Sequence, residues 1–129
     1  MESAWLDYLR GRSVASGAIY WGHAARGAPP LRVVLRLINE PQARVASGAA
    51  SLSRASVQAD IFALDYPAAW AVRDAIKAAA LSVSTDRPAM LRQVNVDGAR
   101  DLSDLEKDGE FKVRLVLDLE IIFHTQNEG

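Results

Sequence analysis

Acidic side chains are the first candidates for chemistry in this chain of 129 residues. They gather between positions 97 and 108, in a segment that contains Asp97, Asp101, Asp104, Glu106 and Asp108. Calcium loops space their carboxylates as DxDxDG and place a glutamate at the twelfth position, and this segment has neither feature. We therefore interpret residues 97–108 as a solvated, turn-rich connection between two elements.

A second pair of carboxylates, Asp118 and Glu120, falls on one face of a long predicted strand. Two carboxylates side by side can serve as general acid and base. However, Lys112 and Arg114 share that face, and opposite charges on neighbouring strands stabilise a sheet. We expect Asp118 and Glu120 to form cross-strand ion pairs with residues such as Arg32, Arg36 or Arg54.

Other catalytic patterns are missing from the sequence. The two histidines, His23 and His124, stand outside any ligand pattern such as HExxH, and there is no cysteine for a disulfide or a thiolate metal site. Trp5, Trp21 and Trp70 could stack on bases, but we expect aromatic side chains to fill the inner faces of a small core. The sequence thus predicts neither an enzyme nor a cofactor or metal site.

Composition and charge restrict the partners. The 15 basic and 16 acidic residues give a formal net charge of −1, without the basic excess that proteins use to grip nucleic acid. The N-terminal residues do not form a signal peptide, and no apolar run reaches the roughly 20 residues of a membrane span. We expect a single domain over residues 1–129, without a membrane partner.

The segment from 109 to 125 is the element around which the others are organised. Its odd positions are all apolar and its even positions are mostly polar, which is the period-two pattern of a strand with one buried face. The predicted inward residues are Phe111, Val113, Leu115, Leu117, Leu119, Ile121 and Phe123. We expect a central or near-central strand.

Similar reasoning divides the rest of the chain. The expected elements are a helix at 2–10, strands at 19–21, 31–39 and 54–64, a main helix at 66–82, and a weaker strand at 89–96. Asp65 is the expected N-cap of the main helix, a long mobile loop is expected at about 40–53, and residues 126–129 are an expected frayed tail. The fold class is α+β, with a mainly antiparallel sheet of about four to five strands and both helices on one face.

The succession of these pieces resembles a known protein family. A strand of the form R-x-x-V-Q-x-D-x-aromatic-A leads into a helix that begins at a tyrosine, and the matching residues are Arg54, Val57, Gln58, Asp60, Phe62, Ala63, Tyr66 and Ala69. The last strand carries the matching Arg114 and Asp118. From about residue 3 to 124, the chain resembles the tail-completion or tail-terminator proteins of long-tailed bacteriophages and gene transfer agents. It departs from them at Tyr20-Trp21-Gly22, where an aromatic-proline pair is common.

The resemblance implies a structural virion protein that is assembled in the host bacterial cytoplasm. Members of the family form a six-membered ring that caps the head-proximal end of the tail tube, ends its polymerisation and joins the tail to the neck. The implied partners are other copies of the chain, the tail tube protein and a neck or stopper protein, and DNA passes through the channel as cargo. No cofactor is implied.

Under this resemblance we expect charged residues of the outward strand faces, and of the loop around Arg44, to contact the ring neighbours and the tube. The candidates are Arg32, Arg36, Arg44, Arg54, Lys112, Arg114, Asp118 and Glu120. Two alternatives remain open. The chain could be a head-closure or neck protein of the same connector, or a small cytoplasmic ligand-binding or regulatory α+β module with a closed pocket.

Overall fold

The structure of the protein is a computed structural model that describes residues 1–24, 26–40, 52–88, 90–105 and 111–124. The helices are α1 (Glu2–Gly11), the short 3-10 helix η1 (Val14–Gly17) and α2 (Tyr66–Asp86). The strands are β1 (Ile19–Trp21), β2 (Arg32–Asn39), β3 (Leu52–Ala63), β4 (Leu91–Asp101), β5 (Asp104–Leu105) and β6 (Phe111–His124).

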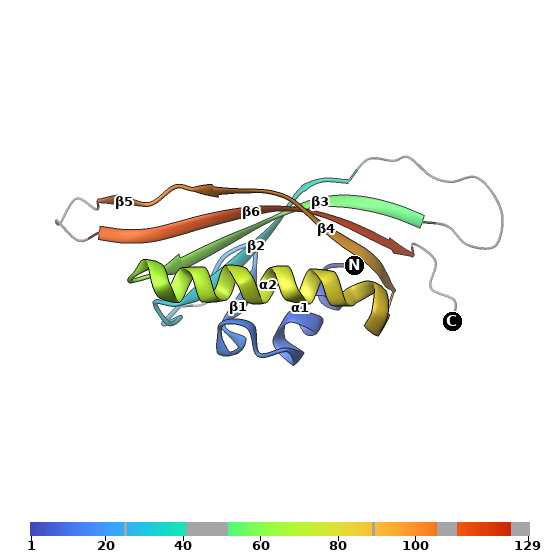
Figure 1. Cartoon of the computed structure of the whole chain (residues 1–129), viewed down its shortest axis with the longest axis horizontal. Coiled ribbons are helices and arrows are strands. Elements are labelled where there is room, and N and C mark those ends of the chain that lie inside the picture. Colours follow the sequence, from blue (N-terminus) through green and yellow to red (C-terminus); the bar gives the residue numbers. More distant parts are fainter. Residues whose placement is uncertain (25, 41–51, 89, 106–110, 125–129) are drawn as a thin grey trace.

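The strands form one sheet in the order β1-β2-β3-β6-β4, and β5 pairs with the beginning of β6. The pairing is antiparallel throughout except between β1 and β2, which run parallel. Both α-helices lie on the same side of the sheet (Figure 1). This arrangement confirms the predicted α+β class and the predicted central position of the long strand, β6.

The core lies between the sheet and the helices. The predicted inward residues of β6 from Val113 to Phe123 are all buried, while the side chain of Phe111 is outside the described part. On α2 the buried residues recur at one-turn spacing and are mostly small, which lets the helix pack closely on the sheet. They are Ala69, Val72, Ile76, Ala79, Ala80 and Val83. Trp5 and Leu9 of α1 complete the core.

The start of α2 follows the sequence pattern. The Asp65 carboxylate accepts a hydrogen bond of 2.9 Å from the backbone N–H of Ala68, as expected of an N-cap. The helix ends at Asp86, four residues beyond the predicted position 82. The extra turn has support from α1, because Tyr8 Oη donates to the Asp86 carboxylate at 2.7 Å and Arg12 Nη1 lies 3.6 Å from it. Such contacts between helices are not visible in local propensity.

Residues 97–108 were predicted to form a turn-rich connection, and this prediction is wrong for residues 97–105. β4 continues to Asp101 in register with β6, and β5 follows after two residues. Two β-bulges interrupt the pairing of β4, one between Leu91 and Gln93 and one between Val96 and Gly98. Each bulge adds an unpaired residue and reverses the inside–outside alternation, so the strand shows no continuous period of two. Residues 106–108 are outside the described part.

Several smaller expectations also need correction. In the strand predicted at 31–39, the alternation of Leu31, Val33, Leu35 and Leu37 predicts four inward side chains, but Leu37 is 38% exposed near the end of β2. Trp70, expected in the core, is 45% exposed on α2, where it stacks on Tyr66. Trp5 is buried, as expected, and Trp21 is partly buried. β3 begins at Leu52, inside the stretch predicted as a loop at 40–53. The remainder of that stretch (41–51) and the tail at 126–129 lie outside the described residues.

Candidate interaction surface on the open face of the sheet

The sheet face opposite the helices is made by the residues that alternate with the core positions. We call it the open face. Its described members on the paired strands include Arg32, Val34, Arg36, Arg54, Ser56, Gln58, Asp60, Phe62, Asn95, Gly98, Arg100, Lys112, Arg114, Val116, Asp118 and Glu120. Six of these are cationic and three are anionic, and Asp104 of β5 is in register with Lys112. The described open face therefore carries a small cationic excess although the whole chain has a net charge of −1.

Asp60 occupies the centre of the open face and is completely buried. One carboxylate oxygen, Oδ2, accepts from Arg114 Nη2 at 2.7 Å and from Arg36 Nη2 at 3.1 Å. The other oxygen, Oδ1, accepts from Gln58 Nε2 at 2.7 Å. A buried carboxylate needs such partners because it has lost its hydration.

Two valines flank Asp60 on the neighbouring strands. Val34 and Val116 are both in register with it, and they are 7% and 0% exposed. The two arginines reach over this region to the Asp60 carboxylate, so their aliphatic stems shield apolar surface while their charged ends remain partly exposed. The centre of the open face is therefore a small second core covered by arginine side chains.

Two further ion pairs lie beside this centre. Arg54 Nη1 donates to Glu120 Oε2 at 3.3 Å, which confirms the expected pairing between these strands, and Asn95 Nδ2 donates to Glu120 Oε1 at 3.1 Å. Asp118 pairs with Arg100 on β4 at 3.2 Å rather than with a residue of β2 or β3. Arg100 was hidden in the segment predicted as a connection. The side chains of Asp118 and Arg100 are 42% and 51% exposed, so this pair contributes little to stability.

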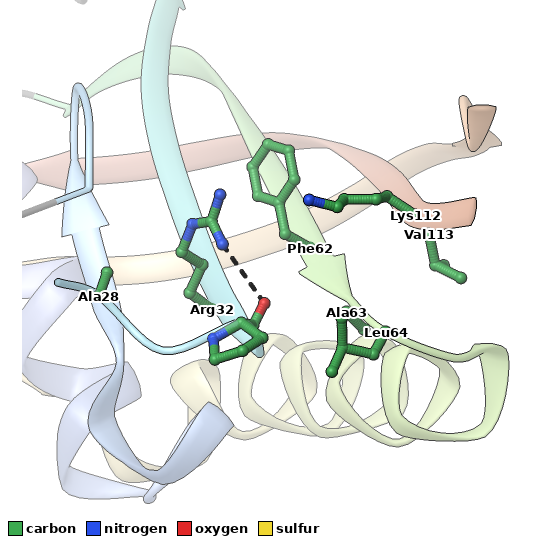
Figure 2. Close-up of a pocket in the computed structure, with 8 residues that line it drawn as sticks. Ala28, Arg32, Phe62, Ala63, Leu64, Lys112 and Val113 are labelled. Atoms are coloured by element: carbon green, nitrogen blue, oxygen red, sulfur yellow. Dashed lines mark hydrogen bonds between the residues drawn. The ribbon is translucent and has the colours of Figure 1, made fainter. Parts of the chain in front are cut away.

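A pocket of about 260 Å³ opens at one end of the same face, where β2 and β6 begin and β3 ends. It is lined by Ala28, Pro30, Arg32, Phe62, Ala63, Leu64, Lys112 and Val113. The guanidinium of Arg32 and the amine end of Lys112 both point toward the ring of Phe62 (Figure 2). The Arg32 guanidinium carbon is 4.6 Å from the centre of that ring, a cation–π distance.

The described residues offer little support for catalysis. They contain no group of three or more histidine, cysteine or acidic side chains that could hold a metal ion. Asp118 and Glu120, the considered acid–base pair, are each engaged in an ion pair. Hydrogen bonds from Ser103, with a further one from Tyr66, lower the pKa of Asp101 at the end of β4. These contacts keep Asp101 ionised and tie β4 to the start of α2. Within the described part, no helix is long and apolar enough to span a membrane.

The structure distributes the predicted interface residues over this surface. Arg36 and Arg114 meet at Asp60, Arg54 and Glu120 pair, Asp118 pairs with Arg100, and Arg32 and Lys112 line the pocket. Arg44 lies outside the described residues. Sequence reasoning did not single out Asp60, Phe62 or Arg100 as site residues. For Asp60 and Phe62 the sequence did contain a signal, because both fall on the outward face of the strand predicted at 54–64.

These features define a small α+β domain with one helix-covered sheet face and one charged open face. No protein-family model matches the sequence, and no curated protein matches it. Among solved structures, the chain is similar to a chain of the structure described as the virion of a native gene transfer agent (GTA) particle. The TM-score is 0.63, the identity is 12%, and the match covers 96% of this chain and 94% of the other. The two chains thus share a fold over nearly their whole lengths.

Proposed function

We propose that the protein is a structural component of a phage or gene-transfer-agent virion, and that it forms the ring that ends the tail tube and joins it to the neck. The observation that carries this proposal is the shared fold, over nearly the whole of both chains, with a chain of a gene transfer agent virion. The resemblance of the motif from Arg54 to Ala69 to tail-terminator proteins supports the specific position in the particle.

The open face supports a role in assembly. Its exposed charges have both signs, with a cationic excess, and a neighbour that presents the opposite order could match them. One contact of this kind, repeated head to tail between copies, closes a ring when the rotation allows it. Five candidate contact residues lie in the described part of the chain. They are Arg32, Arg54, Lys112, Asp118 and Glu120. We retain Arg44 as a candidate from the sequence.

Arg36 and Arg114 have a different place in this proposal. Both are committed to the buried Asp60 carboxylate inside the subunit. Their exposed surfaces can still contact a neighbour, but replacing either of them also removes an internal ion pair. Asp118 also has an internal partner, Arg100, but both side chains of that pair are well exposed. A variant at Asp118 therefore disturbs the subunit less and is the cleaner probe of the interface.

The ligand-binding alternative has less support. Small-molecule sites usually have volumes of about 300–1,000 Å³ and enclose most of their ligand, whereas the pocket beside Phe62 has a volume of about 260 Å³. The head-closure alternative concerns the same particle and differs in its partner, which would be the portal side of the neck rather than the tail tube.

The decisive experiment measures the mass of the purified protein by light scattering across a concentration series, with electron micrographs of the same samples. The measurement is repeated with tail tubes polymerised from the tube protein of the same particle. Six-fold rings in solution, or a monomer that forms rings on tube ends, is the expected result. A fixed monomer or dimer that ignores tube ends contradicts the tail-terminator role, and binding to neck proteins alone selects the head-closure role.

A further inference from the structure

We propose that the pocket formed by Arg32, Phe62 and Lys112 binds a carboxylate group presented by a partner protein. The inference rests on the proposed role in assembly for the existence of such a partner. The chemistry of the site rests on contacts within this chain.

The first argument is that Arg32 lacks a carboxylate partner among the described residues. The other arginines of the open face each have one: Arg36 and Arg114 bind Asp60, Arg54 binds Glu120, and Arg100 binds Asp118. Within the described part of the chain, the polar and ring contacts of Arg32 are to the backbone oxygens of Pro29 and Pro30, both at 3.4 Å, and to the ring of Phe62. A guanidinium offers five N–H donors in a planar fork that suits a carboxylate, so much of its capacity remains available.

The second argument is that this guanidinium is already positioned. Its Nη1 donates to the backbone oxygens of Pro29 and Pro30. The Phe62 ring lies beside the guanidinium (Figure 2), so these contacts orient it before a ligand arrives. A side chain that is held in its binding geometry loses less conformational entropy on association. Lys112, which is in register with Asp104 of β5, places its amine end on the other side of Phe62 (Figure 2). The described lining residues include no acidic side chain.

The third argument concerns what surrounds the charge. The other lining residues are apolar, and Leu64 at the rim is 65% exposed. This combination suits a carboxylate on a polypeptide, whose neighbouring apolar group can cover Leu64, better than a small hydrated anion. It also suits DNA poorly, because the Arg32 guanidinium occupies a position 4.6 Å from the centre of the Phe62 ring, where a base would have to stack.

Two proteins could present the carboxylate. One is a second copy of this chain, because Asp97 lies exposed at a bulge of the edge strand β4 and has no ion-pair partner among the described residues. The other is a different virion protein. The chemistry at Arg32 is the same in both cases.

The test uses the full chain and an acidic dipeptide, N-acetyl-leucyl-glutamate N-methylamide, with its glutamine counterpart as the neutral control. Saturation-transfer NMR observes the peptide and works for a monomer or a ring. We expect the acidic peptide to bind and the neutral peptide to bind at least about tenfold more weakly, the loss typical of one charge-assisted hydrogen bond. Arg32→Gln should lower the affinity for the acidic peptide by a similar factor.

Arg54→Gln is the matched control, since it removes an arginine that already has a partner on the same face. It should leave peptide binding unchanged. Circular dichroism and thermal unfolding check that Arg32→Gln folds, and Lys112→Gln provides a second variant if it does not. Equal binding of the acidic and neutral peptides overturns the proposal, and so do equal losses of affinity in the Arg32 and Arg54 variants. It is also overturned if a short oligothymidylate displaces the peptide from the wild type and itself binds more weakly to Arg32→Gln.

The same variants separate this proposal from the proposed function. If Arg32→Gln and Asp97→Asn both abolish rings while the fold is kept, a second copy supplies the carboxylate. If Arg32→Gln loses the peptide but still forms rings, a different protein supplies it. A chain that never forms rings but binds the acidic peptide through Arg32 contradicts the ring function and leaves the carboxylate site supported.

Discussion

A buried carboxylate lies at the centre of the sheet face that the described helices leave open. Asp60 is completely buried, and its carboxylate pairs with Arg36 and Arg114, whose side chains are 49% and 36% exposed. The cluster holds three strands together, because Arg36 is on β2, Asp60 is on β3 and Arg114 is on β6. The cluster therefore fixes the positions of the Arg36 and Arg114 guanidinium groups on the open face.

We expect Asp60→Ala to lower the free energy of unfolding by about 2–4 kcal/mol, because it leaves two arginines without their carboxylate and opens space beside two buried valines. Urea denaturation of the wild type and the variant measures this difference. Asp118→Ala is the matched control, since it removes an exposed carboxylate from the same face, and it should cost less than about 1 kcal/mol. Similar losses in the two variants would show that Asp60 is an ordinary surface ion pair.

At the scale of elements, the N-terminus of α2 depends on one side chain. We expect Asp65→Ala to lower the free energy of unfolding by about 1 kcal/mol, because the N–H of Ala68 loses its acceptor. Asp74→Ala, on an exposed part of the same helix, is the control and should change stability by less than about 0.5 kcal/mol. Thermal unfolding of the two variants provides the comparison, and equal effects would contradict a capping role for Asp65.

The contact between α1 and the last turn of α2 should depend on pH. Burial, followed by the hydrogen bond to Asp86, raises the pKa of Tyr8 above its ordinary value of 10.0. The protonated phenol is thus favoured in the folded state, and its stabilising effect is fully present below the unfolded-state pKa. It is lost as the pH rises through the folded-state pKa, because the phenolate cannot donate to Asp86.

We therefore expect part of the stability that the wild type loses as the pH rises above 10.0 to be absent in Tyr8→Phe, which has no phenol to titrate. Urea unfolding at a series of pH values measures the difference between the variant and the wild type. Tyr20→Phe is the control, because the Tyr20 hydroxyl has no hydrogen bond among the described residues. If Tyr8→Phe follows the wild-type curve at every pH, the contact with Asp86 does not contribute.

At the scale of the whole molecule, the proposed assembly depends on exposed charges and should respond to salt. We expect the ring population to fall when the ionic strength rises from about 0.05 to about 0.5 M, because salt screens contacts between exposed charges. Sedimentation velocity at several salt concentrations measures the population, and circular dichroism confirms that the subunit stays folded. A ring that persists or grows with salt would indicate that apolar contacts, such as those at Leu64, dominate the interface.

The sequence by itself determined the elements whose patterns are local. The alternation in β2, β3 and β6 and the one-turn spacing of apolar residues in α2 predicted their positions and their buried faces, because side-chain direction follows directly from backbone period. The N-cap Asp65 belongs to the same group, since it depends on one element. A cross-strand ion pair at Glu120 was also expected, but with Arg32, Arg36 or Arg54 left open, and the structure selects Arg54.

Only the tertiary structure decided the features that depend on register between distant segments. The bulges of β4 removed its sequence period, so its full length, and with it the pairing of Arg100 with Asp118, became visible only against β6. Asp60 reads as one more outward charge until Arg36 and Arg114, 24 and 54 residues away, are placed over it. The pocket beside Phe62 likewise exists because β2 and β6 both begin where β3 ends, and no local pattern encodes that meeting of three strand ends.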